Sequence, residues 1–137
     1  MTTNTESSAL SEKAVRDVLR SAMEAWSNND ADAFTSFYAE DVSVVLPAGV
    51  YHKNRKEIRQ YMAAGFAGPL KGSEGIDRQE SVRILGEDAA VVVSLSGYRL
   101  PGESEVPPGR LRRATWVLAK ENGRWLVKAY HNCVIDN

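Results

Sequence analysis

The chain has 137 residues, of which 43% are hydrophobic and 26% are charged, and its formal net charge is −1. This length fits one domain, and the composition is that of a soluble globular protein, which argues against a disordered chain. No apolar run approaches the ~18 residues of a membrane span, and the basic excess typical of nucleic-acid-binding proteins is missing. We therefore expect neither a membrane nor a nucleic acid as a partner.

Metal and cofactor sites have little support in the sequence. The single cysteine, Cys133, excludes an internal disulfide and any multi-cysteine metal site, and two histidines, His52 and His131, leave little for a transition metal. No phosphate-cradling glycine loop and no dinucleotide motif are present. We predict no metal and no cofactor.

The N-terminal residues 1–8 are polar and rich in Ser and Thr, without the apolar core of a secretory signal. We expect residues 1–8 to form a disordered tail and residues 9–137 to form a single domain. Without an export signal, the expected location is cytoplasmic, where the cysteine stays reduced.

Helical patterns lie in the first half of the chain. A helix is predicted from about Ser11 to Ser27, with Glu12 placed to pair with Arg16 one turn later. Its apolar stripe consists of Val15, Val18, Leu19, Ala22 and Trp26. Asp30 is the expected N-cap of a short second helix. Asn54 and Glu57 have the spacing of a capping box at the start of a third helix, which Gly68-Pro69 ends.

The remaining segments are typical of strands. A short strand is predicted at 42–46, and longer strands at about 76–85, 89–100, 110–120 and 125–134. Asn122-Gly123 is a strong hairpin signal between the last two. Helices that precede a meandering sheet indicate an α+β fold, with the helices packed on one sheet face.

Strict alternation on the last strand would place Trp125, Val127, Ala129, His131 and Cys133 on the helix-facing side. Two interpretations of His131 remain open. It is either a core histidine bonded to a backbone carbonyl or a pocket residue that binds or protonates a ligand. Cys133 is expected to be an apolar filler of the same face.

Three arginines, Arg110, Arg112 and Arg113, are either an anion site or a solvated strand end paired with Glu103 or Glu105. The strands also carry apolar residues on both faces, which favours a dimer packed through the outer sheet face but is equally compatible with ordinary exposed side chains. The aromatic residues near the helices form either the core or the lining of an apolar small-molecule cavity. They are Trp26, Phe34, Phe37, Tyr38, Tyr61 and Phe66.

Three segments together resemble a known family: WSNNDADAFTSFYAEDVSVVLPAG at 26–49, NRKEI at 54–58 and GRWLVKAYHN at 123–132. They look like the NTF2-like superfamily, and more narrowly its small SnoaL-like/DUF4440 (SgcJ/EcaC-type) members, encoded in enediyne antibiotic clusters. The resemblance implies an NTF2-like cone, in which the N-terminal helices pack on a strongly curved mixed, mainly antiparallel sheet. It also implies a pocket at the wide end and a homodimer through the sheet. The fold alone fixes no function.

Ketosteroid isomerase, an enzyme of this superfamily, uses an aspartate base, a tyrosine and a protonated aspartate. The positions that match them in this sequence are Leu46, Ala22, and Ala114 or Thr115, so all three functional groups are missing. A SnoaL-type polyketide cyclase also needs a placed carboxylate. The candidates are Asp30, Asp32, Glu40, Asp41, Asp77 and Asp88, most of which occupy expected caps and turns.

The sequence thus leads to the hypothesis of a cofactor-free protein that binds a hydrophobic polyketide, an enediyne or a polyene, as a biosynthetic accessory or self-protection protein. The expected ligand-binding residues are Trp26, Phe37, Tyr38, Tyr61, Phe66, Trp116 and His131. One alternative is a cyclase, isomerase or dehydratase with His131 as its acid/base. A third is a structural partner of a larger synthase.

Overall fold

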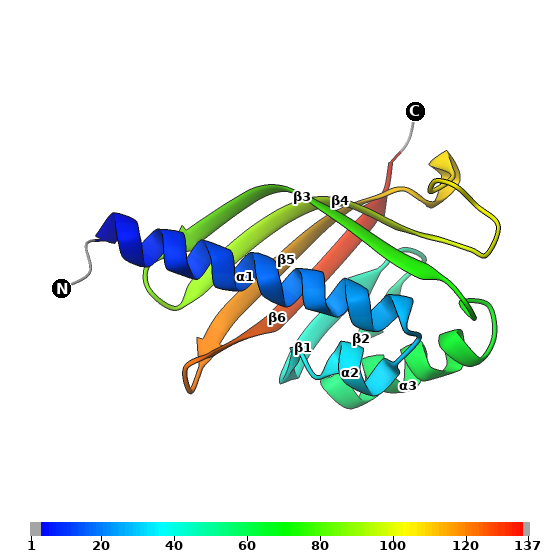
Figure 1. Cartoon of the computed structure of the whole chain (residues 1–137). Helices are drawn as coiled ribbons and strands as arrows, with labels where there is room; N and C mark the ends of the chain where they lie inside the picture. The colour runs from blue at the N-terminus through cyan, green and yellow to red at the C-terminus, as the bar shows by residue number, and fades with distance from the viewer. Residues whose placement is uncertain (1–3, 136–137) are drawn as a thin grey trace.

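The computed structural model describes residues 4–135 as three helices against one sheet (Figure 1). The helices are α1 (Asn4–Ser27), α2 (Ala31–Thr35) and α3 (Arg55–Ala67), and a short 3-10 turn spans Pro108–Arg110. The strands are β1 (Tyr38–Leu46), β2 (Val50–His52), β3 (Glu74–Leu85), β4 (Ala89–Arg99), β5 (Arg112–Glu121) and β6 (Arg124–Val134).

The sheet has six strands in the order β2-β1-β6-β5-β4-β3. Only β1 and β6 run parallel, and every other neighbouring pair is antiparallel. The helices lie on one face of the sheet. Helix α1 crosses the sheet, and α2 and α3 lie below the C-terminal end of α1 (Figure 1). The predicted α+β fold with a mixed, mainly antiparallel sheet is therefore confirmed.

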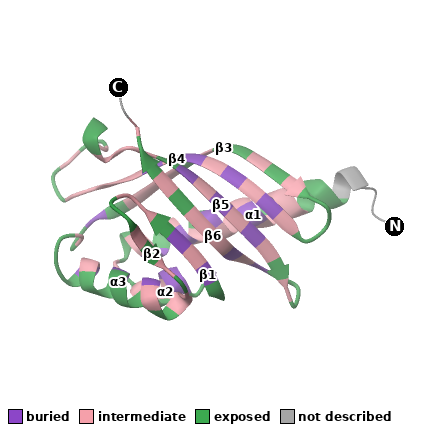
Figure 2. Cartoon of the chain, turned by 180° about the vertical axis from the view of Figure 1, so that it is seen from behind, coloured by how far each residue is buried: buried purple, intermediate pink, exposed green. Residues whose placement is uncertain are grey.

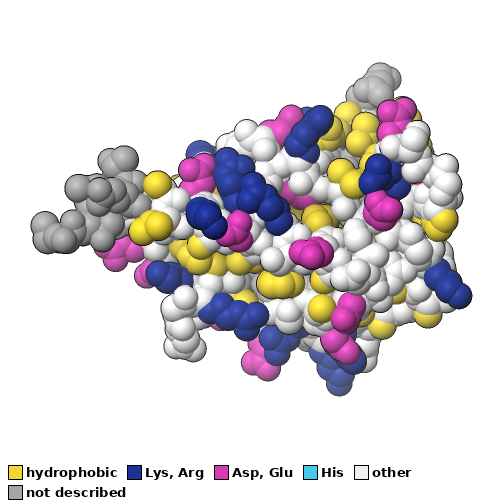
Figure 3. Space-filling model, viewed as in Figure 1, with side chains coloured by type: hydrophobic (Ala, Val, Ile, Leu, Met, Phe, Trp, Pro, Cys, Tyr) yellow, Lys and Arg dark blue, Asp and Glu magenta, His cyan; other side chains and the backbone are white. Residues whose placement is uncertain are grey.

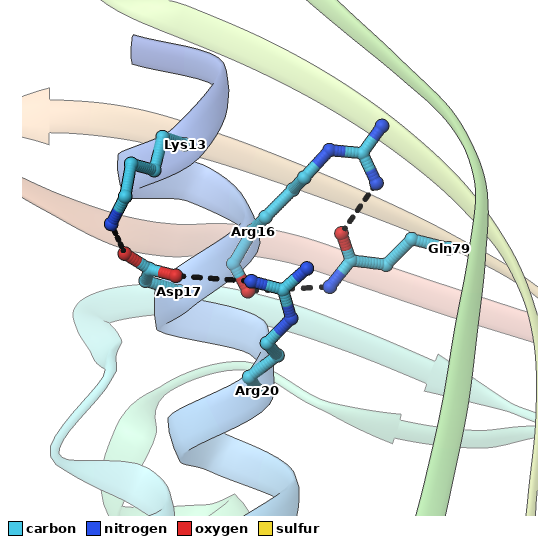
Figure 4. A network of polar contacts seen from close by, with 5 residues as sticks. All are labelled: Lys13, Arg16, Asp17, Arg20 and Gln79. Carbon is cyan, nitrogen blue, oxygen red and sulfur yellow. Dashed lines mark hydrogen bonds and ion pairs between the residues drawn. The ribbon is translucent and has the colours of Figure 1, made fainter. Parts of the chain in front are cut away.

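Helix α1 buries the predicted apolar stripe: Val15, Leu19 and Ala22 have no exposed surface. Its outer side is charged, and Figure 3 shows Lys, Arg, Asp and Glu side chains gathered along it. The predicted ion pair forms, with Arg16 Nη2 3.1 Å from Glu12 Oε1. Arg16 also reaches Gln79 on β3, while Asp17 lies between Lys13 and Arg20 (Figure 4).

The start of α1 differs from the prediction. The helix begins at Asn4, so residues 4–8 are helical and not a disordered tail, and only residues 1–3 of the expected tail lie outside the described part. Polar Ser and Thr side chains disfavour a helix only weakly, and no Gly or Pro interrupts this segment. The helix thus extends beyond its apolar stripe.

The predicted caps are present. Asp30 accepts a hydrogen bond from the Ala33 N–H at 3.0 Å, and Asn54 accepts one from the Glu57 N–H at 2.9 Å. The Glu57 carboxylate accepts from the Lys53 N–H at 2.7 Å, one residue before the position that a standard capping box uses.

A short strand went unrecognised in the sequence. Ala48 and Gly49 have positive φ angles of 68° and 75°, and they turn β1 back into the three-residue β2. Pro47-Ala48-Gly49 indicated the turn, but three residues are too few to show an alternation. Strand β1 also begins at Tyr38, four residues before its predicted start.

The β-bulges of β3 and β6 decide which of their side chains face the helices. In β6, Val117 of β5 pairs with Ala129 but Leu118 pairs with Val127, so Lys128 is an extra residue. A similar shift in β3 lies between Gln79 and Ser81. One inserted residue exchanges the two faces of a strand from that point onward.

The alternation predicted for β6 is therefore wrong beyond Lys128. Trp125 and Val127 are buried as expected, whereas His131 and Cys133 are exposed on the outer face. Tyr130 and Asn132, which strict alternation places outside, face the helices instead and line the cavity there. Figure 2 shows this outer face of the sheet from behind, without a covering helix.

Candidate functional site

A cavity of about 600 Å³ lies between the inner face of the sheet, α3 and the C-terminal end of α1. Helix α3 contributes Ile58, Tyr61 and Met62, α1 contributes Met23 and Trp26, and β5 and β6 contribute Trp116 and Tyr130. Most of the wall is apolar or aromatic, and a few polar groups converge at one side. This combination is typical of sites that bind small organic molecules.

Trp26 is an aromatic ring of the wall that several contacts hold in place. Its Nε1–H donates to Ser73 Oγ at 2.8 Å, and its ring is stacked on Tyr98 with 6.0 Å between centroids. Phe34 and Phe66 contact it edge-on at 5.6 and 5.7 Å. A ring fixed on three sides offers a ligand a rigid apolar surface.

The structure brings together four of the seven predicted site residues. Trp26, Tyr38, Tyr61 and Trp116 line the cavity. The other three, Phe37, Phe66 and His131, do not line it.

Phe66 lies behind Trp26 and is part of the core. Phe37 packs against the core from the turn just before β1, where its carbonyl accepts the Val127 N–H at 2.9 Å. His131 lies on the opposite face of the sheet, because the bulge at Lys128 turns it outward. The prediction of His131 as a pocket residue is therefore wrong, and so is the alternative of a buried core histidine.

Polar groups gather on the sheet side of the cavity. The Trp116 Nε1–H donates to Asp77 Oδ2 at 2.9 Å, and Asn132 Nδ2 donates to the Tyr130 hydroxyl oxygen at 2.8 Å. Three buried oxygen atoms here make no hydrogen bond of good geometry within the described residues: Asp77 Oδ1, Ser94 Oγ and Asn132 Oδ1. Buried polar atoms without partners are rare in proteins and need an explanation.

Burial shifts the ionisation of this cluster. It raises the pKa of Asp77, although nearby Ser94 and the bond from Trp116 act in the opposite direction. Burial, with the neighbouring Tyr130 and Asp77, also raises the pKa of Tyr38 well above its ordinary value. Burial likewise raises the pKa of Tyr130, against the effect of its bond with Asn132. The cluster thus favours uncharged, hydrogen-bonding forms.

The sequence interpretation missed Tyr130 and Asn132, because the bulge that turns them inward leaves no sequence signal. Asp77 is one of the six candidate carboxylates, and nothing in the sequence distinguishes it from the other five, most of which were expected at caps and turns. In the structure, Asp77 differs from the other candidates in its position. It pairs in register with Ser96 on the inner face of the sheet, behind the cavity wall.

The three arginines separate into different environments. Arg110 pairs with Glu103 and lies over the Tyr98 ring at 4.7 Å, while the exposed Arg113 pairs with Glu80. Arg112 lines the cavity, and its Nη1 donates to the Gly109 and Leu111 carbonyls, both at 3.0 Å. Of these three, only Arg113 fits the predicted solvated strand end, because Arg110 lines the cavity as Arg112 does, although Arg110 has its predicted partner Glu103.

Within residues 4–135, no three His, Cys, Asp or Glu side chains come close enough together to hold a metal ion. None of the described helices is both long and apolar enough to cross a membrane.

Comparison with known proteins identifies the domain type. Residues 15–136 match the SnoaL-like domain family. No curated protein matches the sequence.

Solved structures with the same fold are numerous. A cystatin-like domain of unknown function from Nostoc punctiforme has a TM-score of 0.85 and 23% identity, covering 99% of this chain and 81% of its own. An NTF2-like protein of unknown function from Pseudomonas putida has a TM-score of 0.81 and 17% identity, with 95% and 90% covered. A ketosteroid isomerase-like protein from Erwinia carotovora has a TM-score of 0.73 and 16% identity, with 92% and 97% covered. These identities establish the shared fold.

Proposed function

This chain belongs to the SnoaL-like domain family, and from that premise we propose that it binds a hydrophobic small molecule of the polyketide class in the cavity. The observation that carries the proposal is the cavity of about 600 Å³ with its wall of fixed aromatic rings. Folds of this kind generally serve ligand binding or isomerase-type chemistry. Stacked aromatic faces suit a conjugated molecule such as an enediyne or a polyene.

The resemblance to proteins of enediyne clusters supports a role in secondary metabolism, as a cytoplasmic biosynthetic accessory or self-protection protein. We also propose a homodimer through the outer sheet face. Large apolar side chains are exposed there, among them Val45 at 39% and Leu85 at 49%. If a larger synthase uses this same face, the protein is a structural partner instead.

The test is mass spectrometry of a polyketide-rich extract after incubation with stoichiometric protein, with retained and free molecules both analysed. A retained, unaltered conjugated molecule supports binding. The key variant is Ala64→Trp, which fills the cavity from an exposed position of α3. Its control is Ala63→Trp, on the same helix but away from the cavity.

We expect Ala64→Trp to lose the retained molecule and Ala63→Trp to keep it. Equal retention by both variants, or no retained molecule with the wild-type protein, would reject the proposal. Retention of a synthase subunit in place of a small molecule would favour the structural-partner function.

A second candidate function is a cofactor-free isomerase, because Asp77 is a buried carboxyl group with a raised pKa close to two tyrosines. Its carboxylate would take a proton from a carbon beside a ligand carbonyl and return it to another carbon. Tyr38 or Tyr130 would hydrogen-bond the carbonyl oxygen meanwhile. Asp77 lies behind Trp116 and Ser96, so the ligand would have to reach past them, and simple binding requires no such step.

Binding and isomerisation differ in the small molecule that is recovered after the incubation. An isomerase releases a product of unchanged mass, and Asp77→Asn would abolish its formation while the cavity still binds the molecule. A retained molecule that is never altered, by the wild-type protein or by Asp77→Asn, would exclude the isomerase.

A further inference from the structure

Arg112 is the charged side chain of the cavity wall that has no carboxylate partner among residues 4–135. Its neighbours in sequence show the usual arrangement: Glu103 neutralises Arg110, and Glu80 neutralises Arg113. Among the described residues, Arg112 donates to two backbone carbonyls, both through Nη1. A guanidinium that keeps donors free beside an apolar cavity favours an anionic group on the ligand.

The strand register places further polar groups around Arg112. Ser96 of β4 is its direct partner, and Asn132 of β6 is opposite Ala114, two residues along β5. Diagonal neighbours of this kind are within reach of long side chains. All three residues line the cavity, so the polar groups form one row across β4, β5 and β6.

Asn132 supplies an independent indication of a polar ligand group. Its Nδ2 donates to the Tyr130 hydroxyl oxygen, and its Oδ1 is buried with no donor in the described part of the chain. A carboxylate has no hydrogen to give to this oxygen, but a hydroxyl group has one. The row therefore offers positive charge at Arg112 and a hydrogen-bond acceptor at Asn132.

We propose that the natural ligand is a hydrophobic hydroxy acid, whose carboxylate pairs with Arg112 and whose neighbouring hydroxyl donates to Asn132 Oδ1. Its apolar body fills the space between Trp26, Met62 and Trp116. This inference rests on the proposed binding function, and it specifies the polar end of the bound molecule.

Calorimetric titration tests it with three probes that share a 12-carbon acyl chain: methyl dodecanoate, dodecanoic acid and 3-hydroxydodecanoic acid. The ester reports on the apolar cavity alone. We expect the acid to bind about 10-fold more tightly than the ester, which corresponds to about 1.4 kcal/mol. The hydroxy acid should gain a further factor of about 3.

Two variants test which side chain causes each increase in affinity. Arg112→Met should remove the preference for the acid over the ester, and Asn132→Leu should remove the preference for the hydroxy acid over the acid. Arg113→Met is the matched control, because Arg113 is exposed and paired with Glu80, and it should retain both preferences. Circular dichroism verifies that each variant is folded.

The outcomes separate the two proposals. Equal binding of ester and acid by the wild-type protein would overturn the hydroxy-acid assignment but leave the binding function intact, even if a variant fails to fold. A preference for the acid that Arg113→Met loses as fully as Arg112→Met would also overturn it. Binding of none of the probes would count against both proposals.

Discussion

The inner face of the sheet has two halves that differ in chemistry. Toward the turn between β3 and β4, the inward residues are apolar and fully buried, as with Ala90, Val92 and Leu118. Toward the other end, the same strands present Ser94 and Ser96 and the cavity opens. The first half supplies the stable core, and the second leaves space and polar atoms that have no hydrogen-bond partner within residues 4–135.

The β-bulges of β3 and β6 lie at the boundary between these halves. In β3, inward Val82 is followed beyond the bulge by Gln79 and Asp77, and in β6, inward Val127 is followed by Tyr130 and Asn132. Bulges bend and twist a sheet locally and aim side chains in a new direction. In this protein they coincide with the change from the packed core to the cavity wall.

The largest expected effect is on the packed half. Leu19→Ala removes a fully buried side chain beneath α1 and should lower the free energy of unfolding by about 3 kcal/mol, as cavity-forming substitutions do. Urea unfolding measures it. Leu10→Ala is the control, because Leu10 of the same helix is 66% exposed. Equal effects from both would contradict the assignment of α1's buried stripe.

A smaller effect is expected from Trp116→Phe at the boundary. Phenylalanine keeps most of the ring but removes the N–H that donates to Asp77 Oδ2. Loss of a hydrogen bond to a buried carboxyl group should cost about 1–2 kcal/mol. Trp125→Phe, in the packed half, measures the loss of ring volume alone. Urea unfolding should show Trp116→Phe to be the more destabilising, and the reverse order would contradict the bond.

The sequence predicted the packed half well and the cavity half only in part. Periodicity, caps and the Asn122-Gly123 turn are local signals, and they gave the helices and most strands correctly. A bulge depends on pairing with a neighbouring strand, here Val117 with Ala129, and has no local signature in β6. For that reason Trp116 and Tyr38 were found, while Tyr130 and Asn132 were not.

The next prediction concerns pH. Burial raises the pKa of Asp77 above the ordinary 3.8, so the folded state binds this proton more tightly than the unfolded state. Its contribution to stability therefore decreases as the pH rises above about 3.8. Asp77→Asn keeps an acceptor for Trp116 but carries no charge. The variant should gain stability relative to wild type between pH 4 and neutrality.

Urea unfolding of both proteins across this range measures the difference. Asp32→Asn is a control of opposite sign, because the hydrogen bond from Arg59 lowers the pKa of the exposed Asp32. Because this pKa lies below the ordinary 3.8, the variant should lose stability relative to wild type as the pH rises toward about 4, and the difference should then stay constant up to neutrality. A difference for Asp77→Asn that stays constant from pH 4 to neutrality would mean that the carboxyl group is not held in a buried site.

The smallest expected effect is the most informative about the register of β6. His131→Ala replaces an exposed side chain on the outer face and should change the free energy of unfolding by no more than about 0.5 kcal/mol. Probe binding by calorimetry should also stay unchanged, while Asn132→Ala, one residue later, should weaken the binding of 3-hydroxydodecanoic acid. Adjacent residues of a strand face opposite sides, so these two variants report on the two faces. If His131→Ala weakened binding and Asn132→Ala did not, strand β6 would follow the strict alternation of its sequence, without the bulge at Lys128.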